Sequence, residues 1–188
     1  MGPQIYLASR SPRRQELLRQ VGVRFELLPA DVPEQRKRGQ SPADYAIETA
    51  LVKARAARAP QPLPVLGADT DVVIDDEILG KPRDRDEAVA MLSRLSGRTH
   101  EVFSAVAAVL DGRSETALVV TRVSFGAITP QQARAYWDTG EPADKAGAYA
   151  IQGFGAQFVK EIHGSYSGVV GLPLYETLQL LERFGVRS

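Results

Sequence analysis

Two long strand-like runs joined by Asp111-Gly112 constrain this chain more than any other feature. The runs are HEVFSAVAAVL, residues 100–110, and RSETALVVTRVSF, residues 113–125. Asp-Gly between two such runs is a strong signal for a β-hairpin, because this pair tolerates the positive φ angles that a two-residue turn requires. The apolar content of both runs predicts that this hairpin lies in the centre of a sheet.

Helices and strands alternate around the hairpin, which predicts an α/β fold with an antiparallel element. The first strand is expected to begin at Ile5, and residues 65–79 are expected to form a strand, a bend at Gly67, a second strand and a tight turn at Asp75-Asp76. Capping signals and apolar periodicity predict the helices. They are expected at residues 12–22, 41–59, 84–97, 129–140 and 173–185. In the second of these, Ser41 is the expected N-cap, and Asp44 would complete a capping box.

Composition excludes several classes of protein. A chain of 188 residues with 44% hydrophobic residues is able to bury one good core, and a single domain over residues 1–188 is expected. The lack of cysteine rules out disulfides, a thiolate nucleophile and a cysteine-bound zinc. The only histidines, His100 and His163, are too few for a multi-histidine metal site and are expected at turns or strand ends.

Charge and hydropathy argue against nucleic acid and membrane partners. Lys plus Arg equals Asp plus Glu, 23 of each, so the chain has no overall positive field and any basic site must be local. The start MGPQIYLAS has neither a charged leader nor an apolar core, and no run approaches the ~20 apolar residues of a membrane span. A cytoplasmic protein is therefore expected.

The first polar cluster lies at a predicted strand-to-helix turn. It consists of Ser9, Ser11, Arg13 and Arg14. Ser11 and Pro12 suit the N-cap and first helical position. Two arginines in the first helical turn are electrostatically unfavourable, because the helix dipole is already positive there. A multiply charged anion would make the placement favourable, although a solvated arginine pair is the alternative.

The next two clusters lie on the second helix and around the motif GADT. Lys53 is either a ligand-facing or a solvent-facing lysine of that helix. Asp69 and Thr70 follow a buried-looking run, and Lys81 follows the turn beyond them. An acid between apolar residues needs a partner, and a divalent cation is one candidate; capping of a turn is the other interpretation of Asp69.

The fourth cluster is EPADKAGAYAIQGFGAQFVKEIHGSYSGVVGLPL, which contains Asp144, Lys145, Gln152 and six glycines. Close approach of the backbone suggests a ligand wall, whereas loop flexibility explains the glycines equally well. Neither a Walker loop nor a dinucleotide fingerprint is present. If phosphate binds, side chains must therefore do much of the work, and lysines lie in or beside three of the clusters.

Five motifs, in order from Ile5 to Phe184, resemble the Maf nucleoside triphosphate pyrophosphatases. They are S-R-S-P-R-R at 9–14, K-A-R at 53–55, G-A-D-T at 67–70, G-K-P at 80–82 and D-K-A-G-A-Y-A-I-Q-G at 144–153. The resemblance implies hydrolysis of a nucleoside triphosphate to monophosphate and pyrophosphate with Mg²⁺ or Mn²⁺. It also implies a homodimer, and an elongated mixed sheet flanked by helices, with two lobes around a cleft, similar to the inosine triphosphatase fold.

Within that family, G-A-D-T together with A-Y-A-I-Q-G resembles the branch that acts on dTTP and UTP. Arg13, Thr70 and Gln152 match the positions associated with this preference. Asp71 departs from the apolar residue common after G-A-D-T.

The resemblance assigns roles to eleven residues. Asp69 and Glu34 are the implied catalytic and metal-binding carboxylates, with Asp69 binding the metal, orienting the water or acting as base. The implied substrate-binding residues are Ser9, Arg13, Arg14, Lys53, Thr70, Lys81, Asp144, Lys145 and Gln152. Two other classes compete with hydrolysis: a nucleotide-binding regulator of septum formation without turnover, and a phosphotransferase, which would be expected to show a phosphate loop or kinase signatures.

Overall fold

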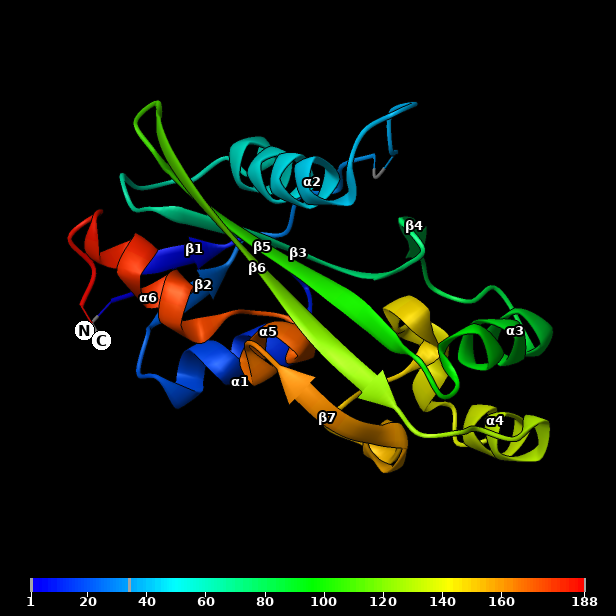
Figure 1. Cartoon of the computed structure of the whole chain (residues 1–188). Coiled ribbons are helices and arrows are strands. Elements are labelled where there is room, and N and C mark those ends of the chain that lie inside the picture. The colour runs from blue at the N-terminus through cyan, green and yellow to red at the C-terminus, as the bar shows by residue number, and fades with distance from the viewer. Residues whose placement is uncertain (1, 34, 188) are drawn as a thin grey trace.

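A seven-stranded mixed sheet forms the centre of the computed structural model, which describes residues 2–33 and 35–187 (Figure 1). The strand order is β2-β1-β3-β5-β6-β7, and β4 pairs with β3. β1 is parallel to β2 and β3, and the other pairs are antiparallel. The strands are β1 (Ile5–Leu7), β2 (Phe25–Leu27), β3 (Val65–Ile74), β4 (Glu77–Leu79), β5 (Thr99–Leu110), β6 (Arg113–Phe125) and β7 (Val159–His163). The predicted mixed α/β sheet is confirmed.

The central hairpin is confirmed as the longest pairing in the sheet. β5 and β6 are in continuous register from Thr99↔Ser124 to Leu110↔Arg113. Asp111 and Gly112 have φ angles of 48° and 82°, as a two-residue turn with two left-handed positions requires. The predicted turn at Asp75-Asp76 is of the same kind, with φ angles of 54° and 59°.

Helices cover both faces of the sheet. α2 lies on one face, and α1, α5 and α6 lie on the other, while α3 and α4 stand near the far end of the hairpin (Figure 1). The helices are α1 (Pro12–Gln20), α2 (Pro42–Ala56), α3 (Arg85–Leu95), α4 (Pro130–Trp137), α5 (Tyr166–Val170) and α6 (Leu174–Glu182). Among the helices of the described residues, none is both long and apolar enough to cross a membrane.

The helices begin where the capping signals predict. Ser11, Ser41, Asp84 and Thr129 each accept a hydrogen bond from a backbone N–H of the first turn. The full capping box predicted at Ser41 is wrong: the Asp44 carboxylate accepts from the Ser41 hydroxyl at 2.7 Å rather than from its backbone N–H. Aspartate is one methylene shorter than the glutamate typical of this position, so only half of the box forms.

The predicted bend at Gly67 is also wrong, because β3 runs unbroken from Val65 to Ile74. The glycine serves close packing instead. A Cβ at position 67 would lie 2.2 Å from the backbone oxygen of Ala50 and 2.8 Å from the backbone nitrogen of Ala54, both on α2. Small residues on both sides therefore let α2 approach the strand more closely than side chains of ordinary size would permit.

The segment expected to be a glycine-rich ligand wall has more regular structure than the sequence indicates. It contains three 3₁₀ turns followed by β7 and α5. The turns are η1 (Glu141–Asp144), η2 (Ala146–Ala148) and η3 (Phe154–Phe158). Gly147 has a φ of 66°, and a Cβ there would lie 2.8 Å from Val72 of β3, so this glycine lets η2 pack directly on the sheet.

We expect Gly67→Ala to destabilise the protein by about 1–3 kcal/mol, because its methyl group would overlap backbone atoms of α2 that have little freedom to move. Gly126→Ala is the matched control, since a Cβ there would be 3.7 Å from its nearest neighbour, the Lys160 side chain. Urea unfolding of both variants measures the difference. Equal free energies of unfolding for the two variants would show that α2 moves away from β3 at little energetic cost.

Candidate active site

One cavity of about 740 Å³ collects the candidate residues from distant parts of the chain. It lies between the β1–α1 turn, α1 and α2 on one side and η1, η2 and the 150–152 segment on the other, so the expected two lobes around a cleft are present. Ten of the eleven candidates line it: Ser9, Arg13, Arg14, Lys53, Asp69, Thr70, Lys81, Asp144, Lys145 and Gln152. The eleventh, Glu34, lies outside the described residues.

The cavity opens at an unpaired stretch of the β3 edge. β1 pairs with β3 at Val65 and Leu66, and β4 pairs with it from Val72 onward. Between these contacts, no strand of the described residues pairs with this edge from Gly67 to Asp71. Because side chains alternate along a strand, Asp69 and Thr70 point to opposite faces of the sheet. Both border the same cavity because the cavity lies at the edge.

Asp69 is nearly buried and is held by a lysine of α2. Its residue is 7% exposed, and its Oδ1 lies 2.7 Å from the Nζ of Lys53. The close approach of α2 at Gly67, two residues earlier on the same face of β3, makes this ion pair possible. The prediction that this acid needs a partner is confirmed, and among the described residues Lys53 is such a partner.

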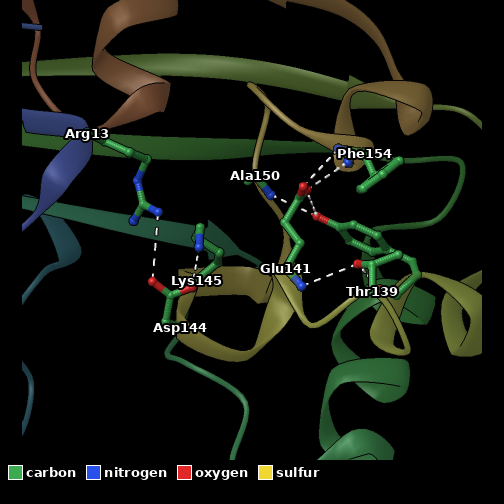
Figure 2. A network of polar contacts seen from close by, with 9 residues as sticks. Arg13, Thr139, Glu141, Asp144, Lys145, Ala150 and Phe154 are labelled. Carbon is green, nitrogen blue, oxygen red and sulfur yellow. Dashed lines mark hydrogen bonds and ion pairs between the residues drawn. The ribbon is translucent and has the colours of Figure 1, made fainter. Parts of the chain in front are cut away.

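The two adjacent arginines of α1 have different surroundings. The Arg14 guanidinium donates to the Gly171 carbonyl oxygen (2.9 Å), to the Ser9 hydroxyl (3.1 Å) and to the Thr70 hydroxyl (3.3 Å). It therefore ties the turn after β1, β3 and the end of α5 together. Arg13 instead extends across the cavity toward Asp144, with 3.9 Å between its Nη1 and the carboxylate (Figure 2).

Asp144 stands between two cations. Lys145 contacts its carboxylate from the neighbouring position, and Arg13 faces it from the other lobe (Figure 2). Partial burial alone would raise the pKa of Asp144, but the hydrogen bond and charge of Lys145, with the charge of Arg13, hold that pKa below its ordinary value. The carboxylate thus bridges the two lobes with a charged contact.

The cavity is locally basic although the whole chain is neutral. Among the described residues that line it, six are cationic and four are carboxylates. The cationic ones are Arg10, Arg13, Arg14, Lys53, Lys81 and Lys145. Lys81 and Gln152 line the cavity and are exposed. This arrangement suits a ligand that carries several negative charges.

Residues 4–184 match the sequence model of the family described as Maf-like protein. The chain belongs to the Maf family. A dTTP/UTP pyrophosphatase of Saccharophagus degradans is 54% identical over 187 residues, which is 97% of this chain and 89% of that relative. A dTTP/UTP pyrophosphatase of Escherichia coli O157:H7 is 51% identical over 182 residues, covering 96% of this chain and 92% of the relative.

Solved structures of more distant proteins also resemble this Maf chain. A nucleoside-triphosphatase, a dITP/XTP pyrophosphatase of Mycobacterium abscessus, is 19% identical with a TM-score of 0.47, covering 95% of this chain and 93% of that one. A HAM1 protein of Coxiella burnetii is 20% identical with a TM-score of 0.46, covering 65% and 73% of the two chains.

The side chains present fit a cation that arrives with its ligand. The described residues contain no group of three or more histidine, cysteine or acidic side chains able to hold a metal ion by themselves. Mg²⁺ is commonly bound through one or two carboxylates together with substrate phosphates and water. Asp69, at the open strand edge inside a basic cavity, is a carboxylate of that kind.

Sequence reasoning missed the wall behind Gln152. Tyr149 lines the cavity, and its hydroxyl lies 2.8 Å from Nε2 of His100, which is 1% exposed. Phe125 packs edge-on against both rings, with centroids 4.8 Å away in each case. His100 is the second residue of β5 and His163 the last of β7, so both lie at strand ends as predicted. The contact between His100 and Tyr149 joins residues 49 positions apart, so no local sequence pattern predicts it.

We expect His100 to make stability depend on pH. Burial lowers the pKa of His100 from 6.5 to about 4. Between these pH values the unfolded chain binds a proton that the folded chain does not. The stability contributed by the neutral imidazole is therefore complete above pH 6.5 and falls by up to ~3 kcal/mol as the pH approaches 4.

Urea unfolding between pH 4.5 and 7 tests this expectation. His100→Gln, which keeps a polar group near the Tyr149 hydroxyl, should flatten the pH dependence. His163→Gln is the matched control, because the side chain of His163 is 57% exposed. A pH dependence that is unchanged in His100→Gln would assign the effect to other groups.

Proposed function

We propose that this Maf protein hydrolyses nucleoside triphosphates, with dTTP and UTP preferred, to the monophosphate and pyrophosphate. One domain over residues 1–188 would carry the activity. The observation that carries the proposal is the buried Asp69–Lys53 ion pair at the open edge of β3, inside a basic cavity. Relatives about half identical over nearly the whole chain are named dTTP/UTP pyrophosphatases, which supports the choice of substrate.

The reaction requires a group that accepts a proton from water and cations that stabilise the phosphate charge. Water attacks the α-phosphorus, the bond from that phosphorus to the bridging oxygen breaks, and pyrophosphate leaves. Asp69 is the proposed acceptor of the water proton, since it lines the cavity at the open edge of β3 and is held there by Lys53. Arg13, Lys53 and Lys81 are proposed to stabilise the charge on the phosphates. Ser9 and Arg14 would shape the turn beneath them.

A divalent cation, Mg²⁺ or Mn²⁺, is the proposed cofactor, held by Asp69, Glu34 and the phosphate oxygens. When bound, such a cation neutralises phosphate charge and makes the phosphorus more open to attack. Lys53 already places one positive charge beside Asp69. Lys53 would therefore orient the Asp69 carboxylate, while the divalent cation would add positive charge beside the phosphate oxygens.

Recognition of the nucleotide's pyrimidine ring is assigned to Gln152, together with Arg13 and Thr70. The pairing edge of uracil or thymine presents a carbonyl, an N–H and a second carbonyl, and an amide side chain is able both to donate to it and to accept from it. Gln152 lies at the exposed rim, beside the wall that Tyr149 forms. A site built for one edge leaves polar groups unpaired when the wrong base enters, and that penalises purines.

We also propose that the protein is a cytoplasmic homodimer without nucleic acid or membrane partners. The neutral overall charge supports the second part of this proposal, because binding to either polyanion requires a basic surface. Sedimentation velocity at micromolar concentration tests the dimer: a single species of about 20.4 kDa would contradict it.

Asp69→Asn is expected to lower kcat by ~10²-fold or more, because asparagine keeps the shape but cannot accept the proton. The unfolding transition should persist, since the amide oxygen still accepts a hydrogen bond from Lys53. Asp76→Asn, in the exposed β3–β4 turn, is the matched control and should retain full activity. Normal turnover by a folded Asp69→Asn protein would place the base elsewhere.

A nucleotide panel tests the proposed function itself. Release of pyrophosphate is measured for dTTP, UTP, ATP and GTP with Mg²⁺ or Mn²⁺ and with neither. We expect kcat/KM to be at least ~10-fold higher for the pyrimidines and to need the cation. Gln152→Ala should erode the preference more than the rate, and Gln179→Ala on the exposed side of α6 should change neither. Binding without turnover would instead support a regulator, and equal rates for UTP and GTP would contradict the substrate assignment.

A further inference from the structure

Two side chains outside the cavity hold the segment that carries Gln152. The Tyr136 hydroxyl accepts a hydrogen bond from the Ala150 N–H at 3.0 Å. The Glu141 carboxylate accepts from the N–H groups of Phe154 (2.9 Å) and Gly155 (3.0 Å) (Figure 2). Gln152 lies midway between these two attachment points. The backbone that carries its amide is therefore fixed on both sides.

The two anchoring side chains also bind each other. The Tyr136 hydroxyl donates to Oε1 of Glu141 at 2.5 Å, and the Glu141 N–H donates to the Thr139 hydroxyl at 3.2 Å. Burial alone would raise the pKa of Glu141, but the bonds from Tyr136, Gly155 and Phe154 hold it below its ordinary value. Burial and the Glu141 contact raise the pKa of Tyr136. The network is thus a carboxylate that accepts three hydrogen bonds from a phenol and two backbone groups.

Two glycines make this approach possible. A Cβ on Gly153 would lie 1.9 Å from Oε2 of Glu141, and one on Gly155 would lie 2.6 Å from the Tyr136 hydroxyl. The backbone at Gly153 and Gly155 therefore packs directly against Glu141 and Tyr136, with no side chain of the two glycines between them. Gln152 itself is exposed, so the position of its amide depends on the backbone that these residues hold.

We propose that Glu141, together with Tyr136, positions the Gln152 amide against the pyrimidine base and so sets the selectivity of the enzyme. This inference rests on the proposed function and deepens it. Neither side chain lines the cavity, so both act through the 150–155 backbone and not by touching the nucleotide. A role in folding alone would affect all nucleotides equally, whereas a positioning role affects pyrimidines selectively.

The test is Glu141→Gln, which keeps the shape but gives one of the carboxylate positions an NH₂ group that is unable to accept from the backbone. We expect kcat/KM for UTP to fall about tenfold while that for GTP changes little, because one charge-assisted hydrogen bond to the segment is lost. Inhibition by pyrophosphate should be unchanged. Glu161→Gln, on β7 and paired with His163 outside the cavity, is the matched control and should keep the UTP/GTP ratio.

A double mutant separates positioning from simple destabilisation. If Glu141 acts through Gln152, Glu141→Gln combined with Gln152→Ala should show the same UTP/GTP ratio as Gln152→Ala alone. Tyr136→Phe, which removes one anchor, should lower the ratio in the same direction and serves as the test if Glu141→Gln does not fold.

Two results would overturn the inference. An unmutated enzyme that prefers UTP, with the ratio retained in the folded Glu141→Gln or Tyr136→Phe variant, contradicts the inference and leaves the proposed function intact. An unmutated enzyme without any pyrimidine preference contradicts the substrate assignment and the inference together.

Discussion

The close contact of α2 with β3 at Gly67 is the constraint on which the site depends. Because the glycine has no side chain, the α2 backbone at Ala50 and Ala54 lies directly against the strand. Lys53, on the same face of the helix, then reaches Asp69 two residues along β3 and pairs with it at 2.7 Å. A larger residue at position 67 would separate the helix from the strand, and the buried acid would lose a cation.

The remainder of the site follows from a strand edge left open between β1 and β4. Asp69 reaches the cavity from the α2 face, and Thr70 reaches it from the opposite face, where Arg14 ties it to Gly171. The rim is different in character, because Lys81 and Gln152 are exposed. The proposed proton acceptor, Asp69, is thus held by packing, whereas the proposed recognition residue, Gln152, is carried on backbone that Tyr136 and Glu141 hold in place.

Much of the fold could be predicted because its signals are local. The Asp111-Gly112 hairpin and the N-caps Ser11 and Ser41 depend on residues within a few positions of one another, and all three are confirmed. The prediction of a bend at Gly67 is wrong, since a glycine that permits close packing and one that bends a strand have the same local pattern. The turns and strand within residues 141–163 were missed, because their structure comes from contacts with Val72, Tyr136 and other distant residues.

By itself, the sequence determined the family, the order of the longer helices and central strands, and ten residues that line one cavity, because motifs and caps depend on neighbouring positions. Only the tertiary structure decided how those residues divide their work. It paired Asp69 with Lys53, turned Arg14 toward Gly171, 157 positions away, and extended Arg13 toward Asp144. It also brought Glu141 to the segment of Gln152. Such pairings depend on where helices and strands pack, and packing between distant segments leaves no periodic signal along the chain.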